Sequence, residues 1–579
     1  MVITMILALL NWCYITFIAL ILGIGVMQII SKNTGYDCNE IDIILFMGIA
    51  AVTSYAQMFS LFYKVGALAN IVLFVVCLII IILCRSKLHG IFMAVKTNLA
   101  GRIKDRRLHI CAGILLAFFA FFIIIAVQRA YHADTDGYHA QSIRWIEEYG
   151  AVKGSGNFYH RLAYNSAFMC FQALFSWAFL INQSMHVGNA YLCMAVGCYA
   201  LVSISYFKST SMRGSDIFKI MILLYLCRES VVSILASPNT DTFVLVLLLY
   251  ILTKWCEYNE DDVGQTEAYG NLCLLGVFAL TVKLSAAIIL LLTVRPAIEL
   301  LSAKKWKAIA MYIGIGLFIL GPFCARNVFI SGYPVYPYAS LDPFNVDWKM
   351  LPYSVDFDRK EIMAYGRGIY EISRYDVGIT QWFPVWWETQ TGWIKALLVT
   401  NVILLPVCLL KCVRNLRKKD VGSYDIFIGV TVMIQFLYWM LTAPLMRYGM
   451  VFLFVVPCIL MAHFIEYKKP SAAVAILLSG IIVCLFAVNV VRCTESIPLK
   501  RSSYYVYREC DEIQWEGITV YMAIENGYMG YYFVPGLQHE AMLQYIELRG
   551  SDITEGFRVK EEYKDYEFDT SGRIIGDIL

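Results

Sequence analysis

Residues 131–161 read YHADTDGYHAQSIRWIEEYGAVKGSGNFYHR, a polar and aromatic segment in a chain that is otherwise strongly apolar. Four long apolar runs precede it, near residues 4–30, 42–60, 66–84 and 109–128, and about ten more follow. A helix that spans a bilayer needs about 20 apolar residues. We therefore interpret residues 131–161 as a loop that directly abuts a membrane helix and carries the chemistry of the protein.

The composition excludes an ordinary soluble enzyme, because 59% of the residues are hydrophobic, 16% are charged and the mean hydropathy is +0.63. The net charge of +3 is too small to indicate a nucleic-acid partner. Most of the 18 cysteines lie within apolar runs, where a free thiol behaves as a small hydrophobe. The sequence predicts a mainly α polytopic membrane protein that resides in a lipid bilayer.

Basic segments predict the orientation of the chain in the membrane. They lie at 85–107, 304–307, 411–420 and 467–469, and the positive-inside rule places them in the cytoplasm. Residues 131–161 then lie outside, provided that residues 164–182 lie at or dip into the outer interface. If that segment crosses instead, the orientation inverts as far as residue 304. The count gives about 12–14 transmembrane helices with both termini outside.

The expected organisation has six parts. These are N-terminal transmembrane helices (1–130), a first large outer loop with interfacial helices (131–185), a transmembrane core (186–329), a second large outer loop (330–394), further transmembrane helices (395–490) and a C-terminal α/β cap domain (491–579). Within the core, two short helices are expected to turn at residues 281–283 on the outer side. Within the cap, alternating runs predict strands at 517–523 and 531–534, and a helix is expected at 539–547.

Asp134 and Asp136 are the candidate catalytic residues. Two carboxylates this close could share a metal ion, or one could act as a base that the other orients. A solvated surface pair is the alternative. Trp145 stands where an EF-hand needs Glu, which excludes that calcium motif. His132 and His139 flank the pair, either as metal ligands or, more commonly, as hydrogen-bonding neighbours of the carboxylates. His139 is also a candidate substrate-binding residue.

Asp241 and Lys283 are candidate substrate-binding residues. Asp241 follows SPNT before an apolar run, so it could belong to a helix N-terminus, face the same outer cavity as Asp134, or do both. Lys283 lies in the middle of an apolar stretch, where a cation costs at least about 2.5–3.5 kcal/mol. It either snorkels to the interface or faces a cavity that binds an anionic phosphate.

Four further residues could bind an anionic substrate. Arg326 and Arg447 stand at helix ends, where arginine is either an interfacial anchor or a phosphate ligand. His160 and Arg161 close the first outer loop and could also reach a phosphate.

This combination of one basic carboxylate and several cations suits glycosyl transfer from a lipid phosphate. The carboxylate removes the proton of the acceptor hydroxyl while that oxygen attacks the anomeric carbon, through an oxocarbenium-like transition state. A phosphate leaving group needs no protonating acid, so cations or a divalent metal such as Mg²⁺ or Mn²⁺ can neutralise it. The sequence contains no P-loop or GxGxxG motif, which agrees with a lipid-linked donor.

Several motifs occur in order between residues 131 and 557: HADTDGYHAQSIRWIEEYGAVKGSGNFYHRLAYNS, SPNTD, TVKLS, ARNVFISGYPVYP, WMLTAPLMRYG and LRGSDITEGF. With these motifs the chain resembles the GT-C superfamily of membrane glycosyltransferases, and most closely the LIC_10190 family of bacterial membrane proteins. The resemblance implies a catalytic acid in the first outer loop, interfacial helices beside it and a polyprenyl-phosphate-linked sugar donor. By position the base would be Asp134 or Asp136, and Asp134 is favoured because it lies nearest the preceding helix.

The expected reaction is an inverting transfer to an envelope glycan or lipid-linked acceptor, on the extracytoplasmic face of the bacterial cytoplasmic membrane. A polysaccharide polymerase or ligase is the nearest alternative. A transporter or flippase of lipid-linked sugars is disfavoured, because the sequence shows no internal repeat and its polar residues gather on one face. A non-catalytic scaffold for envelope assembly is a third possibility.

Overall fold

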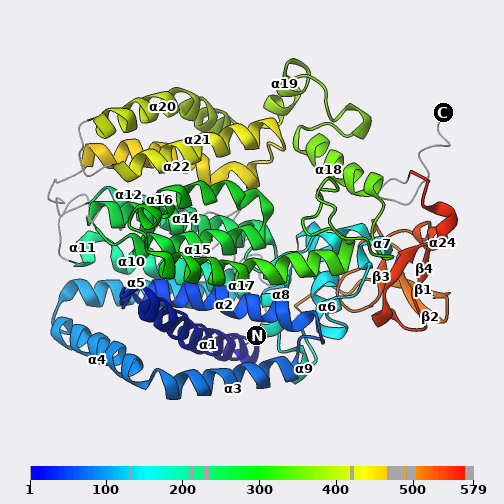
Figure 1. Cartoon of the computed structure of the whole chain (residues 1–579), viewed down its shortest axis with the longest axis horizontal. Helices are drawn as coiled ribbons and strands as arrows, with labels where there is room; N and C mark the ends of the chain where they lie inside the picture. The colour runs from blue at the N-terminus through cyan, green and yellow to red at the C-terminus, as the bar shows by residue number, and fades with distance from the viewer. Residues whose placement is uncertain are drawn as a thin grey trace.

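The computed structural model describes residues 2–130, 132–208, 213–226, 234–261, 263–417, 423–465 and 504–567, together with Cys484 and Val488. Most of the described chain is helical (Figure 1). The α-helices are α1 (Val2–Thr34), α2 (Ile41–Ser60), α3 (Ala67–Leu83), α4 (Arg85–Arg102), α5 (Arg106–Ala126), α6 (Ala140–Glu148), α7 (Ser155–Phe158), α8 (Ala167–Phe175), α9 (Ala178–Ile181), α10 (Gly188–Ser203), α11 (Ser205–Lys208), α12 (Gly214–Leu226), α14 (Thr240–Glu260), α15 (Thr266–Val282), α16 (Val294–Ser302), α17 (Trp306–Ser331), α18 (Pro352–Gly366), α19 (Ile379–Thr389), α20 (Gly392–Arg417), α21 (Ser423–Leu441), α22 (Met446–Ile465) and α24 (Met542–Tyr545).

Short helical turns and two small sheets complete the described structure. The turns are η1 (Thr135–His139), η2 (His160–Ala163), η3 (Leu284–Thr293), η4 (Ile372–Arg374), η5 (Ile553–Glu555) and η6 (Glu561–Tyr563). The strands are β1 (Cys510–Trp515), β2 (Ile518–Ala523), β3 (Gly536–Leu537), β4 (Ile546–Leu548) and β5 (Phe557–Val559). The first sheet has the order β1-β2-β3, and β4 pairs with β5 in the second.

The apolar helices make this a mainly helical membrane protein. Among the described residues, five helical segments are long and apolar enough to cross a bilayer: α1, α2, α5, α17 and the continuous segment Leu284–Ser302. The pair α3–α4, bent by 81°, would add a sixth. Several shorter apolar helices accompany them. These spans are fewer than the 12–14 expected, so that number stays a prediction, and the apolar run at 471–490 lies outside the described residues.

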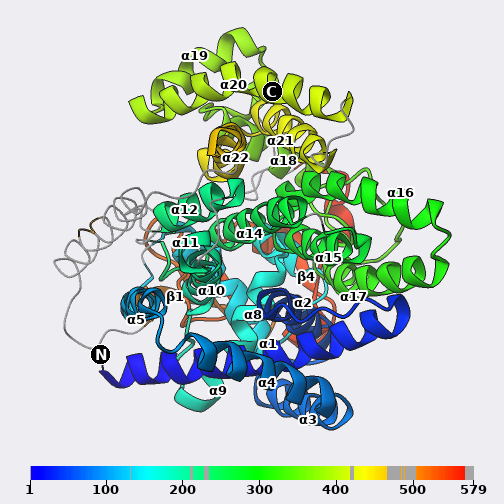
Figure 2. The same ribbon diagram turned by 90° about the vertical axis from the view of Figure 1, so that its left-hand side faces the viewer.

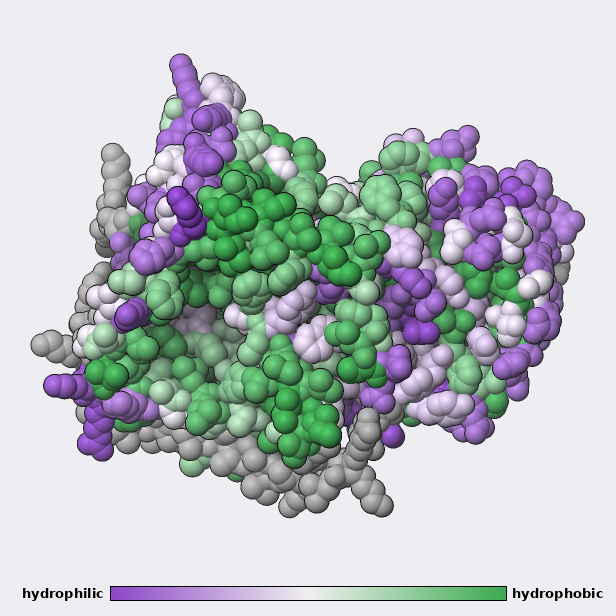
Figure 3. Space-filling model, turned by 90° about the horizontal axis from the view of Figure 1, so that it is seen from below, coloured by the Kyte–Doolittle hydropathy of each residue, from purple (hydrophilic) through white to green (hydrophobic). Residues whose placement is uncertain are grey.

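The molecular surface separates apolar and polar regions along the long axis. A broad hydrophobic face covers the middle of the molecule, and hydrophilic residues gather at the end that carries the strands (Figure 3). The basic helix α4, which buries none of its residues, lies at the opposite end (Figure 1). The polar loop and this basic segment are therefore at opposite ends, as the sequence predicts, although the side of the membrane that each faces stays a prediction.

Helices α20, α21 and α22 form a group at one side of the helical body (Figure 2). The first turn of α22 reaches back to the start of α14, and α22 also packs against α12. This packing brings a helix near residue 450 against helices that lie about 200 positions earlier in the sequence.

The structure refines the expectation for residues 164–182. Helix α8 has nine residues, which rise only about 13 Å, so it is too short to cross a membrane. All nine are buried, and the helix packs against α2 and α6. It is therefore an internal element, and only α9 lies on the surface.

The turn expected near Lys283 is present. Helix α15 ends at Val282, and η3 begins at Leu284 and packs back against α15. The returning segment is a 3-10 helix that continues into α16, instead of the regular α-helix that the apolar pattern predicts. Residues 330–394 also differ from a simple loop, because they contain α18 and α19.

The regular secondary structure of the C-terminal region consists mainly of strands. The strand predicted at 517–523 is β2, which pairs antiparallel with β1 through the two-residue turn Glu516-Gly517. Both turn residues have positive φ angles, 45° and 85°, as a tight hairpin turn requires. The strand predicted at 531–534 is wrong, because these residues form turns before β3. The helix predicted at 539–547 shrinks to α24, and β4 follows it.

The C-terminal region, which is predicted to be an α/β cap domain, shares a hydrophobic core with the first outer loop. Trp145 and Phe158 of the loop pack against Phe557 of β5, with ring centroids 6.0 and 4.8 Å apart. The backbone N–H of Phe557 also donates to the carbonyl of Lys153, at 2.9 Å. The strands therefore hold the loop at the polar end of the molecule (Figure 1).

Candidate functional site

Four charged residues predicted from the sequence meet at the polar ends of four segments. Asp134 precedes the π-helical turn η1, and Asp241 lies in the first turn of α14. Lys283 separates α15 from η3, and Arg447 lies in the first turn of α22. Because each residue stands at an element end, its side chain can reach the shared space without a charge entering an apolar helix interior.

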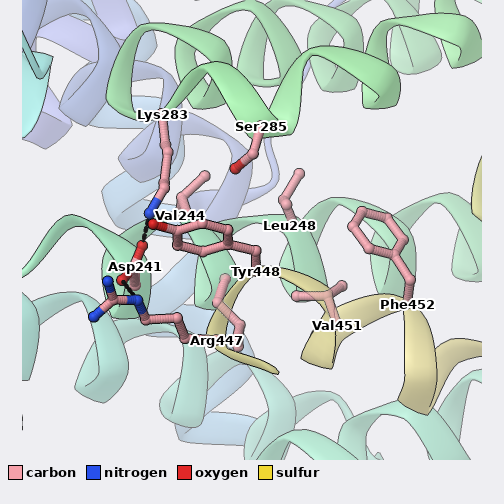
Figure 4. A pocket seen from close by; sticks show the side chains of 10 residues that line it. Asp241, Val244, Leu248, Lys283, Ser285, Arg447, Tyr448, Val451 and Phe452 are labelled. Carbon is pink, nitrogen blue, oxygen red and sulfur yellow. Dashed lines mark hydrogen bonds and ion pairs between the residues drawn. The ribbon is translucent and has the colours of Figure 1, made fainter. Parts of the chain in front are cut away.

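Arg447 links the two carboxylates. Its Nη1 atom lies 3.3 Å from Oδ2 of Asp134, and its Nε atom lies 3.2 Å from Oδ2 of Asp241. Lys283 forms an ion pair with the other oxygen of Asp241 (Figure 4). The Lys283 ammonium also lies 3.7 Å from the centroid of the Tyr448 ring. The four charges alternate in sign and sum to zero, and we call them the Asp134–Arg447 cluster.

The polar residues Asn239 and Asp241 have different roles at the start of α14. Asn239 caps the helix, because its side-chain oxygen accepts a hydrogen bond from the backbone N–H of Thr242 at 2.8 Å. Asp241 therefore does not have to cap the helix, and its carboxylate is available to Lys283 and Arg447. Asp241 thus stands in the first turn of the helix and also lines the cavity, whereas Asp134 contacts Arg447 but is not among the described residues that line the cavity.

A small cavity adjoins the cluster. Asp241, Lys283, Arg447 and the Tyr448 ring stand at one end (Figure 4). The rest of its lining is mainly apolar and comes from α14 and α22: Val244, Leu245, Leu248, Val451 and Phe452. The cavity thus combines a cationic and acidic head with an apolar wall, an arrangement that matches a phosphate joined to a hydrocarbon chain.

Asp134 is the more accessible of the two candidate bases. Its side chain is 27% exposed, and its Oδ2 atom lies 3.8 Å from Nδ1 of His132. That imidazole nitrogen also accepts a hydrogen bond from the backbone N–H of Asp134, at 3.2 Å. The carboxylate therefore has a fixed position and an open side from which an acceptor hydroxyl can approach.

Asp136 points elsewhere. Its Oδ2 atom accepts hydrogen bonds from Nη2 and Nε of Arg508, at 2.6 and 3.1 Å, and its side chain is 5% exposed. Burial raises the pKa of Asp136, and the Arg508 guanidinium opposes that rise. The backbone carbonyl of Asp136 also accepts from the N–H of Gly530. Asp136 thus fastens the loop to the C-terminal region, and the two aspartates do not converge on one metal ion.

His139 lies beside the Asp134–Arg447 cluster, where the charges of Asp134, Asp241 and Lys283 act on it. It is 2% exposed, and its Nδ1 atom has no hydrogen-bond partner within the described part of the chain. Burial lowers the pKa of His139 to about 3. The imidazole is therefore neutral at physiological pH, so His139 can offer a hydrogen bond to a substrate but not a positive charge.

Arg326, predicted as an interfacial anchor or a phosphate ligand, is not among the described residues that line the cavity. It is 5% exposed and donates to the side chains of Ser60 and Asn165, at 2.7 and 3.1 Å. These hydrogen bonds join α17 to the end of α2 and to the segment before α8. Arg326 therefore has a structural role at the contact of three segments.

His160 and Arg161 lie beside α18 and not in the cavity. Both belong to η2, and His160 lies close to Asp358 and Glu361 of α18. The guanidinium carbon of Arg161 lies 5.7 Å from the centroid of the Tyr138 ring. The Tyr138 ring also lies 4.3 Å from the ring of His139, so Tyr138 contacts residues of both neighbourhoods.

Three residues near the predicted sites were not predicted from the sequence: Asp358, Glu361 and Arg508. Asp358 and Glu361 stand three positions apart in α18, a spacing that puts them on one helix face. This spacing can be recognised in the sequence, but the sequence near these residues does not indicate that His160 is their neighbour. Arg508 gave no signal, because its partner Asp136 is 372 positions away.

Comparison with known proteins identifies a family without a known activity. The family described as "Domain of unknown function (DUF8201)" matches residues 5–454, which include the four residues of the Asp134–Arg447 cluster. No curated protein and no solved structure gives a significant match. The match covers most of the helical body and ends before the strands. The chain belongs to the DUF8201 family.

Proposed function

We propose that this protein is an inverting membrane glycosyltransferase that transfers a sugar from a polyprenyl-phosphate donor to an envelope glycan or lipid-linked acceptor. The observation that carries the proposal is the cavity at the Asp134–Arg447 cluster. Its head holds two cations and two carboxylates, and its wall is apolar. A donor that consists of a phosphate and a hydrocarbon chain needs both parts at once.

In this proposal the donor phosphate binds to Lys283 and Arg447. Both cations are paired with carboxylates, so an incoming phosphate competes for their N–H groups. Arginine suits this exchange, because its planar guanidinium has five donors and can hold two oxygens together. The prenyl chain then lies along the apolar side chains of α14 and α22.

Asp134 acts as the base. When Arg447 turns to the phosphate, the Asp134 carboxylate loses part of its compensating charge and can accept the proton of the acceptor hydroxyl. The acceptor oxygen forms a bond to the anomeric carbon as the bond from that carbon to the phosphate oxygen breaks. The negative charge that develops on the leaving phosphate is stabilised by Lys283 and Arg447. The products are the glycosylated acceptor and the free polyprenyl phosphate.

The location of the protein is part of the same proposal. We place the cluster on the extracytoplasmic face of the bacterial cytoplasmic membrane, because the polar loop and the basic helix α4 stand at opposite ends of the apolar body. Polyprenyl-linked sugars and envelope acceptors are expected on that face.

The test compares the surface glycans of a deletion strain after complementation with the wild-type chain, Asp134→Asn or Asp136→Asn. We expect mass analysis to show a missing sugar in the deletion strain, restored by the wild type but not by Asp134→Asn. Asp136→Asn is the matched control, because it changes a neighbouring carboxylate outside the cavity. Immunoblots of membranes would verify equal amounts of protein. Full restoration by Asp134→Asn would refute this assignment of the base.

A further inference from the structure

A second group of polar side chains joins the first outer loop to α18. Among the described residues, His160, Asp358 and Glu361 form the one group of three potential metal ligands whose ligand atoms all lie within 4.8 Å of one another. His160 is 8% exposed and Asp358 is fully buried, whereas Glu361 is half-buried. Bonds from zinc to nitrogen or oxygen ligands are about 2.0–2.2 Å, so each ligand atom would move by up to about 0.7 Å to reach one ion.

His160 provides an independent indication of a ligand. Its Nε2 atom is buried and has no hydrogen-bond partner within the described part of the chain. The same atom lies 4.0 Å from Oδ1 of Asp358, which is too far for a hydrogen bond. A buried polar atom without a partner is costly, so the site calls for a bound group between these two atoms.

The Asp358 carboxylate is oriented by two tyrosines. The hydroxyl of Tyr164 donates to Oδ1 at 2.6 Å, and the hydroxyl of Tyr336 donates to Oδ2 at 3.0 Å. Each carboxylate oxygen has two lone pairs, so one on each remains for a metal. Hydrogen bonds of this kind commonly orient the carboxylates that bind metals.

The charge of the group also favours a cation. Asp358 and Glu361 together carry two negative charges when ionised, and Arg161 is the described cation whose charge acts on Asp358. A divalent cation would compensate the charge of the two carboxylates and would satisfy the orphaned imidazole nitrogen at the same time.

We propose that His160, Asp358 and Glu361 bind a divalent transition-metal ion, Zn²⁺ or Mn²⁺, that fastens α18 to the first outer loop. One imidazole and two carboxylates suit these ions, whereas Mg²⁺ prefers oxygen ligands and water. Two tyrosines connect the proposed ion site to the neighbourhood of the Asp134–Arg447 cluster. Tyr164 donates to Asp358, and its ring lies 5.7 Å from that of Tyr138, which contacts His139.

The experiment measures metal binding by the full chain in detergent. The protein is stripped with EDTA, dialysed against Zn²⁺, Mn²⁺ or Mg²⁺ in separate samples, and its metal content is determined by mass spectrometry. We expect about one equivalent of Zn²⁺ or Mn²⁺ per chain, little Mg²⁺, and a higher unfolding temperature after the ion is restored. His160→Gln and Glu361→Gln should each weaken binding by about tenfold or more.

Glu371→Gln is the control, because Glu371 is an exposed carboxylate in the same outer segment. It should bind the ion as the wild type does. If His160→Gln fails to fold, the half-buried Glu361→Gln decides the test. Wild-type protein without Zn²⁺ or Mn²⁺ above the Mg²⁺ level, or a folded Glu361→Gln variant with unchanged affinity, would overturn the site. Since the readout is bound metal, this result is independent of whether the protein transfers sugars.

Discussion

The Nη1 atom of Arg447 lies 3.3 Å from Oδ2 of Asp134, although the two residues are 313 positions apart. This contact joins the first outer loop to α22, and the same guanidinium also pairs with Asp241. Arg447 therefore holds the candidate base in place and, in the proposed reaction, has to exchange a carboxylate for a phosphate. That exchange makes the cations of the cavity the first residues to test.

Lys283→Met should weaken the binding of polyprenyl phosphate by about tenfold to a hundredfold, because a hydrogen bond to a charged group contributes about 1.5–3 kcal/mol. Arg447 still compensates Asp241 in this variant, so the fold should persist. Binding can be measured by native mass spectrometry of the protein in detergent. Lys307→Met is the control, because Lys307 is an exposed lysine in the first turn of α17, away from the cavity. Equal affinities in the two variants would exclude Lys283 as a phosphate ligand.

Leu248→Trp tests whether the apolar wall binds the prenyl chain independently of phosphate binding at the charged end of the cavity. Leu248 is buried on the apolar wall, and the larger indole would occupy space that a prenyl chain needs. Overpacking costs typically about 1–3 kcal/mol, so a modest loss of stability is also expected. The affinity for a long polyprenyl phosphate should fall, whereas that for inorganic phosphate should not change. Val402→Trp, on the exposed face of α20, is the matched control, and an unchanged affinity for the long chain would contradict the placement.

Arg508→Ala should loosen the C-terminal region. Removing this guanidinium leaves the buried Asp136 carboxylate without its ion-pair partner. Breaking a fully buried pair costs about 3–5 kcal/mol, and since Arg508 is 26% exposed we expect about 2–3 kcal/mol. Thermal unfolding in detergent measures the loss, and limited proteolysis should cut the C-terminal strands faster. Asp136→Asn combined with Arg508→Gln removes both charges and should recover most of the stability, whereas no recovery would indicate another role for Arg508.

Acidification should destabilise the protein through its buried histidines. Burial lowers the pKa of His139 to about 3 and that of His186 to about 4, below the usual value of about 6.5. Between these values only the unfolded chain binds the proton, so stability falls as the pH drops below about 6.5. Each histidine contributes about 1.4 kcal/mol per pH unit over that interval.

The measurement is the unfolding temperature in detergent between pH 8 and pH 5. His139→Gln should flatten the pH dependence, because glutamine does not titrate. The exposed His89 provides the comparison, and His89→Gln should retain the wild-type slope. The same slope in His139→Gln and the wild type would show that His139 is protonated without cost.

Local patterns were sufficient for the helical architecture. Apolar runs predicted the positions of α1, α2, α3 and α5 closely, because a run of about 20 apolar residues has few stable alternatives to a helix in lipid. The turn at Lys283 was also predictable, since a charge in an apolar stretch must reach a polar environment. Short strands were less predictable, because β3 has only two residues and depends on its neighbour β2.

The sequence by itself determined that the chain is a mainly helical membrane protein and which charged residues stand at the ends of its apolar segments. Only the tertiary structure decided their partners. Asp134 and Asp136 are locally almost equivalent, yet Asp134 pairs with Arg447 while Asp136 pairs with Arg508. Likewise His160, a predicted phosphate ligand, lies beside Asp358 and not in the cavity. Ion pairs and packed cores join residues hundreds of positions apart, and periodicity along the chain carries no information about such contacts.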